Sequence, residues 1–289
     1  MFKYSVFTVV LPEYSVPEAA AKMKEWGYDG AEWRVTGVPS PMPSIPNYWS
    51  ANKATVDFAK LPGSAREAKK ISDEAGLEIP TLATYLGCTD LDSVKKAMEA
   101  AQIMGAPMLR VGVPGYDGKT NYRVLFARAQ DDYAKVEHLA KDHGLKACLE
   151  IHMGNICPSA SAAYRFVSVF DPKHVGVIFD PGNMVYEGME NWQFGMELLG
   201  EYLAHVHVKN SGWRIASGQP NGNLVWQPSM ASLRSGIVNW CDVIRALKAV
   251  KYNGWLSNEN FASDLPTDAK LADDLRYLKS LEKEQARKR

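Results

Sequence analysis

The chain has 289 residues, of which 46% are hydrophobic, and its 33 basic residues balance 33 acidic ones. This length and composition suit a fold with a large core, and barrels of alternating strands and helices commonly form one domain of this size. A net charge of zero argues against nucleic acid as the main partner, because phosphate backbones attract a basic surface. We therefore expect no nucleic-acid partner.

The sequence shows neither a secretory signal nor a membrane span. A signal would need a basic segment followed by an apolar run, and the first residues lack that pattern. No apolar run approaches the length that crosses a bilayer. The four cysteines are scattered without paired spacing, which is typical of free thiols: Cys88, Cys148, Cys157 and Cys241. We expect a cytoplasmic protein with no membrane partner.

Short apolar runs alternate with helical patterns along the chain. The predicted strands are 3–10, 30–35, 78–85, 107–113, 146–151, 175–179, 202–208 and 255–258. The predicted helices are 16–26, 64–75, 91–104, 121–143, 159–170, 192–199, 240–250 and 267–284. This strict alternation predicts an α/β fold, a (β/α)8 TIM barrel formed by residues 1–289 as a single domain. A doubly wound open sheet is the alternative, but no Gly-x-Gly-x-x-Gly follows the first strand, which removes its dinucleotide-binding form.

Two long segments interrupt the alternation. The Pro-rich loop 37–61 contains Tyr48 and Trp49, and these aromatic residues favour a lid or a subunit contact over disorder. The insertion 211–236 carries two tryptophans and two arginines among many Gly, Ser, Asn and Pro residues. We expect loop 37–61 to lie over the C-terminal mouth of the barrel. The insertion 211–236 begins just beyond a strand end, so it either lies over the same mouth or is a surface or subunit-contact loop. Both segments are compatible with a homodimer or a homotetramer.

Each of the last four strands ends in a residue type that binds metal ions. These residues are Glu150, Asp180, His207 and Glu259. The carboxyl ends of neighbouring parallel strands meet at one edge, so we expect the four side chains to lie together. Three carboxylates in one place repel one another unless a cation lies between them. This set suits Mn²⁺, Mg²⁺ or Co²⁺, with Zn²⁺ as an alternative.

Each of these residues also has a purely structural interpretation. A single Glu or Asp at a strand end is commonly a helix N-cap or a salt-bridge partner, and a His in an apolar strand is usually a core residue. Four such residues in series favour the metal site. Lys209 lies on the face of His207 and either holds a sugar oxygen, phosphate or carboxylate, or pairs with a carboxylate at the mouth. We expect Glu32 and Arg34 to pair with each other.

Five segments, 19–32, 149–150, 176–183, 205–210 and 252–259, carry a pattern that resembles the sugar phosphate isomerase/epimerase family of xylose isomerase-like barrels. The resemblance covers almost the whole chain. It implies a divalent metal, most commonly Mn²⁺, held by the four strand-end residues. It also implies a sugar or sugar derivative as the small-molecule partner.

The resemblance implies a metal-dependent sugar isomerase or epimerase. In the ketose 3-epimerases of this superfamily the two glutamates move a proton on opposite sides of the sugar, which implies that role for Glu150 and Glu259. The metal stabilises the enediolate that forms when a carboxylate removes a proton next to a carbonyl. Four further residues are expected at the substrate: His152, Asn183, Lys209 and Arg214.

This chain differs from the 3-epimerase pattern at three positions. The pattern has His where Asn183 stands, Glu where Ile156 stands, and Arg where Trp213 stands, with Arg214 one residue later. The metal ligands themselves are unchanged.

Three other functions are compatible with a barrel of this kind. A lyase or dehydratase would use the same site on a keto-sugar, keto-cyclitol or keto-glycoside, expelling a hydroxyl or glycosidic oxygen after proton removal. A non-catalytic carbohydrate-binding barrel would keep the fold without the metal. Apurinic-site endonucleases share the barrel, but their three zinc ions require many histidines, and this chain has six His and no net charge.

Overall fold

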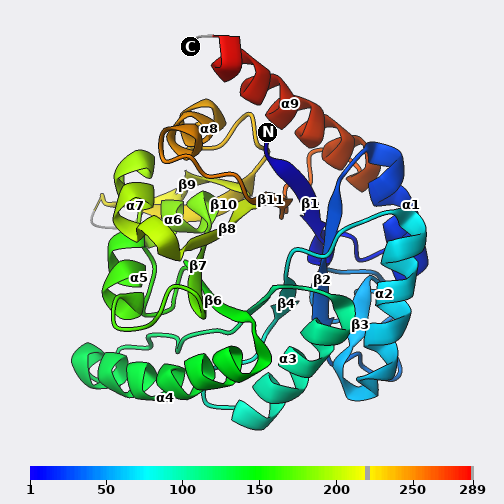
Figure 1. Ribbon diagram of the computed structural model, residues 1–289. Helices are drawn as coiled ribbons and strands as arrows, with labels where there is room; N and C mark the ends of the chain where they lie inside the picture. The colour runs from blue at the N-terminus through cyan, green and yellow to red at the C-terminus, as the bar shows by residue number, and fades with distance from the viewer. Residues whose placement is uncertain (219–221, 288–289) are drawn as a thin grey trace.

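The computed structural model describes residues 1–218 and 222–287. Eight parallel strands form a closed ring, and helices surround it (Figure 1). Around the ring, and back to the first, the strands are β1 (Lys3–Phe7), β2 (Gly30–Thr36), β4 (Leu82–Thr84), β5 (Met108–Arg110), β6 (Lys146–Glu150), β7 (Val175–Phe179), β8 (Leu203–Val208) and β11 (Trp255–Asn258). The predicted (β/α)8 TIM barrel is confirmed.

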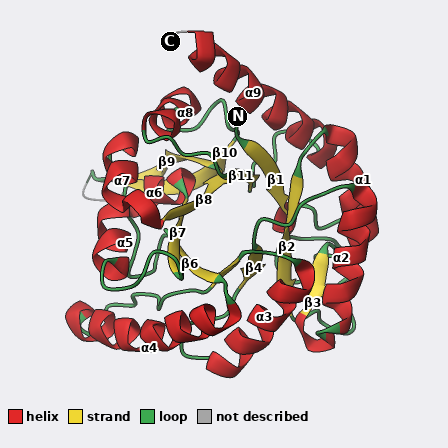
Figure 2. Ribbon diagram, viewed as in Figure 1, coloured by secondary structure: helices red, strands yellow, loops and turns green. Residues whose placement is uncertain are grey.

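The helices lie mainly on the outside of the ring (Figure 2). They are α1 (Val16–Trp26), α2 (Gly63–Ala75), α3 (Leu91–Met104), α4 (Tyr122–His143), α5 (Ala160–Val167), α6 (Pro181–Glu187), α7 (Trp192–Leu199), α8 (Trp240–Ala249) and α9 (Thr267–Arg287). Local sequence sets their ends. Ser15 and Glu18 form a capping box at the start of α1, and Gly27 ends that helix at a φ of 87°, which favours glycine. None of the helices in the described ranges has the length and apolar character needed to cross a membrane.

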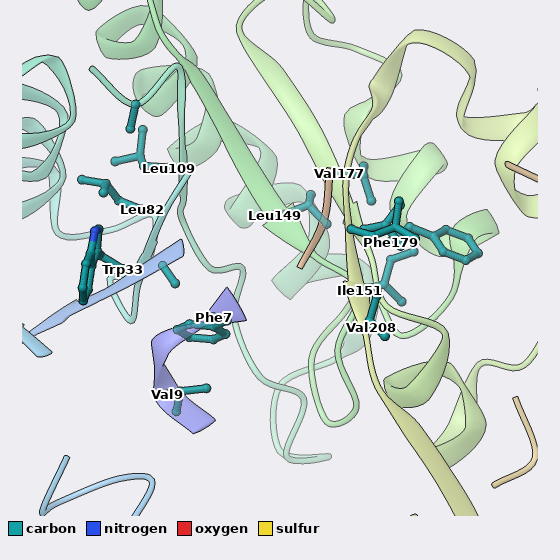
Figure 3. Packing of buried hydrophobic residues seen from close by; sticks show 14 of the residues in the cluster. Phe7, Val9, Trp33, Leu82, Leu109, Leu149, Ile151, Val177, Phe179 and Val208 are labelled. Atoms are coloured by element: carbon teal, nitrogen blue, oxygen red, sulfur yellow. The ribbon is translucent and has the colours of Figure 1, made fainter. Parts of the chain in front are cut away.

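Apolar side chains of the strands pack outward against the helices, and Figure 3 shows part of this layer. Trp33 in β2 is buried there, and its Nε1 donates to Ser72 Oγ in α2 at 3.0 Å. Leu149 and Val177 are also fully buried, and each such side chain contributes roughly 1.5–3 kcal/mol. Because side chains alternate along a strand, the residues between them face into the barrel. This alternation directs Glu32 inward.

Several boundaries differ from the predicted ones. The first strand ends at Phe7, and Thr8–Val10 forms the short 3-10 helix η1. The third and fourth strands are shorter than predicted. Helix α6 was missed because it follows β7 directly, with Pro181 at its first position and Asp180 as its N-cap.

Loop 37–61 contains regular structure. Strand β3 (Thr55–Asp57) runs parallel to β2 and pairs with its last residues, Arg34–Thr36. The 3-10 helix η2 (Phe58–Lys60) follows. A three-residue strand is too short to show a period in the sequence, so the prediction of a plain loop was wrong there.

The insertion 211–236, for which the sequence predicted no strands, contains regular structure. Strands β9 (Asn210–Gly218) and β10 (Leu224–Ala231) form an antiparallel two-stranded ribbon, while residues 219–221 lie outside the described ranges. Trp213 Nε1 donates to Val185 O at 2.8 Å, which fixes the ribbon against α6.

Candidate metal centre and active site

Four neighbouring strands bring the expected ligands together. In the ring, β6, β7, β8 and β11 are adjacent, and Glu150, Asp180, His207 and Glu259 lie at or just after their carboxyl ends. One ligand atom from each lies within 4.8 Å of the others, and all four residues are buried. The cluster therefore lies at the mouth where barrels of this class hold their active sites.

Asp180 has both a structural and a site-facing oxygen. Its Oδ1 accepts a hydrogen bond from Asn183 N at 2.9 Å and caps α6. Its Oδ2 faces Lys209 Nζ at 2.9 Å. Burial, with the nearby Glu259 and Glu150 carboxylates, raises the pKa of Asp180 to about 6 despite Lys209. Capping and ligation are thus compatible, because different oxygens serve them.

Glu150 has three polar neighbours. Its Oε2 accepts from Arg110 Nη1 at 2.5 Å, and its Oε1 lies 3.0 Å from His207 Nδ1 and 3.1 Å from Asn183 Nδ2. Burial alone would raise the pKa of Glu150, but Arg110 and His207 hold it well below its usual value. Glu150 is therefore ionised at neutral pH. The sequence reasoning missed Arg110, whose signal is a charged residue at the end of a buried strand next to Glu150's strand.

His207 joins the cluster to Glu32 inside the barrel. His207 Nε2 lies 3.1 Å from Glu32 Oε1, and His205 Nε2 lies 2.9 Å from Glu32 Oε2. All three residues are fully buried. Burial would raise the pKa of Glu32, but the two imidazoles lower it. Burial would lower the pKa of His207, but the carboxylates of Glu32, Glu150 and Glu259 raise it. This carboxylate is the hydrogen-bond acceptor that a metal-binding imidazole commonly has on its far nitrogen.

The expected pair between Glu32 and Arg34 is not formed, so that prediction was wrong. Arg34 donates instead to Thr55 Oγ1 at 2.7 Å and to Trp49 O at 2.6 Å. Both side chains face inward from β2, but Glu32 lies deeper, where two imidazoles compete for it. Arg34 is the next inward-facing residue along β2, nearer the mouth, and its hydrogen bonds go to loop 37–61.

Lys209 forms salt bridges with carboxylates at the mouth, which was one of the two roles that the sequence suggested for it. Its buried Nζ lies 2.9 Å from Asp180 Oδ2 and 2.5 Å from Glu259 Oε2, and it donates to Asn183 Oδ1 at 2.9 Å. Gly182 makes room for this side chain, because a Cβ there would lie 2.7 Å from Lys209 Cγ. Burial would raise the pKa of Glu259, but Lys209 and His207 lower it.

The donor set fits a divalent cation. Asp180 Oδ2 and Glu259 Oε2 are buried, and neither has a hydrogen-bond partner with suitable geometry among the described residues, although Lys209 lies within ion-pair distance of both. Glu150 Oε1 and His207 Nδ1 complete the group. Three carboxylate oxygens and one imidazole nitrogen match the preferences of Mn²⁺ and related ions.

A cavity of about 280 Å³ opens onto Glu150 and Glu259. His152 lines it, with its Nδ1 2.7 Å from Met153 O. Asn183 is fully buried, and its side chain is hydrogen-bonded to Glu150 and Lys209. Arg214 is exposed on β9 and is not among the described residues that line the cavity. A larger cavity of about 730 Å³ lies beside α7 and α8, away from the cluster, so volume alone does not identify the site.

The fold and the cluster together define a TIM barrel with a candidate metal-binding cluster at its C-terminal mouth. The chain belongs to the xylose isomerase-like TIM barrel family, whose model matches residues 20–281. This membership confirms the resemblance noted in the sequence.

The relatives are enzymes, and the solved structures extend the likeness over the whole barrel. The chain is 28% identical over 176 residues to an inosose dehydratase of Clostridium botulinum, covering 57% of this chain and 55% of that relative. It spans about half the length of the curated relatives it matches. The structure of a 3-keto-D-glucoside 4-epimerase from E. coli has a TM-score of 0.71 at 18% identity, covering 97% of this chain and 100% of that one. A xylose isomerase-like barrel from Mycobacterium smegmatis in complex with magnesium has a TM-score of 0.69 at 16% identity, covering 99% and 98%.

Proposed function

We propose that this chain is a divalent-metal-dependent sugar isomerase or epimerase that moves a proton next to a carbonyl. One observation carries the proposal: Glu150 and Glu259 both line the cavity and both belong to the ligand cluster. A substrate in the cavity therefore meets two carboxylates beside the cation site. Structural relatives that are named as sugar epimerases support the same class.

Four residues would hold the cation: Glu150, Asp180, His207 and Glu259. A divalent ion there, for which we expect Mn²⁺, supplies positive charge that stabilises negative charge developing on the substrate oxygens. The magnesium complex of the Mycobacterium smegmatis relative supports an ion of this class.

Glu150 and Glu259 would transfer the proton. The pKa of each carboxyl is held below its usual value, so each is ionised at neutral pH and can accept a proton. A positioned carboxylate contributes typically ~10²–10⁴-fold to such a step. The two arise from β6 and β11, with two strands between them, so they approach the substrate from different sides. For epimerisation the second carboxyl group would have to enter the step protonated. Delivery of its own proton to the opposite face would invert the carbon and give an epimer, and proton exchange with solvent would then restore both groups.

The other residues predicted at the substrate differ in the role that the structure favours for them. His152 lines the cavity and remains a proposed substrate contact. Asn183 and Lys209 are buried and bonded to the carboxylates. We therefore propose that they hold Glu150, Asp180 and Glu259 in position.

The second candidate is a dehydratase or lyase at the same site. The inosose dehydratase relatives favour it, because their names describe loss of water from a keto-cyclitol. Glu150 or Glu259 would remove the proton, and the same carboxyl group, now protonated, would give that proton to the leaving oxygen as its bond to carbon breaks.

Incubation with a panel of keto- and aldo-sugars in D₂O, with Mn²⁺ added, tests the proposal. An isomerase or epimerase incorporates solvent deuterium into a sugar that keeps all its oxygens. A lyase releases water or an aglycone. A chain that binds sugars with no exchange and no product would be a non-catalytic binding barrel, and the proposed function would be wrong.

A further inference from the structure

An exposed tryptophan borders the cavity. Trp49 lines it together with Glu150 and Glu259, and 59% of this residue is exposed. Large apolar rings gain free energy from burial, so folding alone does not explain an exposed indole beside a polar cavity. Exposed rings at the edge of a concave site are typical ligand contacts.

The backbone of Trp49 is fixed in place. Arg34 Nη2 donates to Trp49 O at 2.6 Å. Asn47 Oδ1 accepts from the backbone N–H groups of Trp49 at 3.0 Å and of Ser50 at 2.8 Å. These hydrogen bonds hold the segment, so the position of the indole is part of the folded structure.

A packed ring connects Trp49 to a site carboxylate. The indole lies 5.6 Å, between ring centroids, from Phe261, which is buried and follows Glu259 by two residues. Tyr48 packs edge-on against the same phenyl ring at 5.0 Å. The distance from Trp49 to Glu259 is therefore set by packing.

Tyr85 provides a second exposed ring at the same cavity. It is 43% exposed and lines the cavity. The guanidinium carbons of Arg34 and Arg110 lie 5.2 and 4.7 Å from its ring centroid. Cation–π contacts of this kind hold the ring in place.

The rings and the carboxylates lie at different depths. Glu150 and Glu259 are 5% and 4% exposed, whereas about half of Trp49 and Tyr85 is exposed. A substrate that reaches the carboxylates therefore has its outer part beside the two rings. We propose that Trp49 and Tyr85 form a subsite for a second ring, joined to the reacting sugar by a glycosidic bond.

This inference rests on the proposed function only in taking the reacting ring to be a sugar. The ligand class is a glycoside whose second ring presents a flat apolar face, as a pyranose or an aromatic ring does. Such faces pack offset on indole and phenol rings.

Calorimetric binding to the full chain with Mn²⁺ tests the subsite. The probes are free glucose and galactose, their methyl and phenyl β-glycosides, cellobiose and lactose. We expect roughly tenfold tighter binding when a second ring is present. Trp49→Ala removes this advantage and Trp49→Phe keeps most of it. Trp226→Ala is the control, because Trp226 is 54% exposed on β10 and is not among the described cavity residues. Comparing the affinities of cellobiose and lactose with those of the phenyl glycosides shows whether the subsite prefers a pyranose or an aromatic ring.

Free sugars that bind as tightly as the glycosides, glycosides that do not bind at all, or an advantage that survives Trp49→Ala would overturn the subsite. An unchanged thermal unfolding midpoint shows that Trp49→Ala still folds. These measurements need no turnover. Absent deuterium exchange therefore counts against the proposed reaction alone, and an absent glycoside advantage counts against the subsite alone.

Discussion

Glu32 Oε1 accepts a hydrogen bond from His207 Nε2 at 3.1 Å, across the interior of the barrel from β2 to β8. His207 Nδ1 faces the carboxylate cluster, 3.0 Å from Glu150 Oε1. A metal ligand nitrogen must be free of its proton, and Glu32 keeps a ring proton on the opposite nitrogen. Glu32 is thus expected to orient a ligand without touching the ion.

Glu32→Gln should lower the affinity for Mn²⁺ by about 10–100-fold, which is typical for the loss of such a partner. Glutamine has one carbonyl oxygen, so it can accept from only one of His205 and His207. Competition with a fluorescent chelator measures the affinity. Glu78→Gln, at an exposed ion pair with Lys3, is the control and should change nothing. Unchanged affinity in a folded Glu32→Gln chain would contradict the assigned role.

Arg110→Met should destabilise the chain by about 3–5 kcal/mol, because it leaves the Glu150 carboxylate buried without its cation. Arg234→Met is the matched control. Its pair with Asp273 is exposed, and such pairs contribute about 0–1 kcal/mol. Urea unfolding of both variants measures the difference, and equal midpoints would show that the buried pair contributes nothing special.

Glu259→Gln should reduce solvent-deuterium exchange into substrate by about 10²–10⁴-fold, since an amide cannot accept the proton. Glu74→Gln, at an exposed helix position, should exchange at the wild-type rate. Mass spectrometry of the recovered sugar gives both rates. Full exchange in Glu259→Gln would remove Glu259 from the mechanism.

Only one thiol should react readily in the folded chain. Burial raises the pKa of Cys88 to about 11 and of Cys148 to about 12, so both remain neutral at pH 8 and unreactive. Cys157 is also buried, whereas Cys241 is partly exposed. Ellman's reagent at pH 8 should titrate one thiol in the native chain and four after unfolding. Two or more fast native thiols would contradict the packing around Cys88 and Cys148.

A raised thiol pKa also predicts the pH dependence of stability. The unfolded chain ionises these thiols at a lower pH than the folded chain does, so stability should fall as the pH rises above about 8.5, the usual thiol pKa. Cys148→Ala should weaken that fall, as measured by urea unfolding between pH 8 and 10. A wild-type chain whose stability is constant over this range would contradict the prediction.

The sequence predicted those parts of the structure that depend on local pattern. The bounds of α1, α3, β7 and β11 agree with the predicted ones, because glycines end the helices and apolar runs define the strands. The gathering of the strand-end residues follows from parallel neighbours alone.

Long-range pairs could not be predicted in the same way. Glu32 and His205 are 173 residues apart, and their contact depends on closure of the ring, in which only β1 and β11 lie between β2 and β8 on one side. A Glu32–Arg34 pair was expected because the two residues are neighbours on one face of the same strand, and their partners on other strands could not be seen in the sequence. Arg110 was missed for the same reason, because its partner lies on the next strand of the ring.

Metal binding itself tests the central claim most directly. We predict that the wild-type chain binds one equivalent of Mn²⁺ in a calorimetric titration. Asp180→Asn, which keeps an oxygen to cap α6 but loses the charge, should lose most of that affinity. A wild-type chain that binds no divalent cation, or an Asp180→Asn chain that binds as tightly as wild type, would contradict the account.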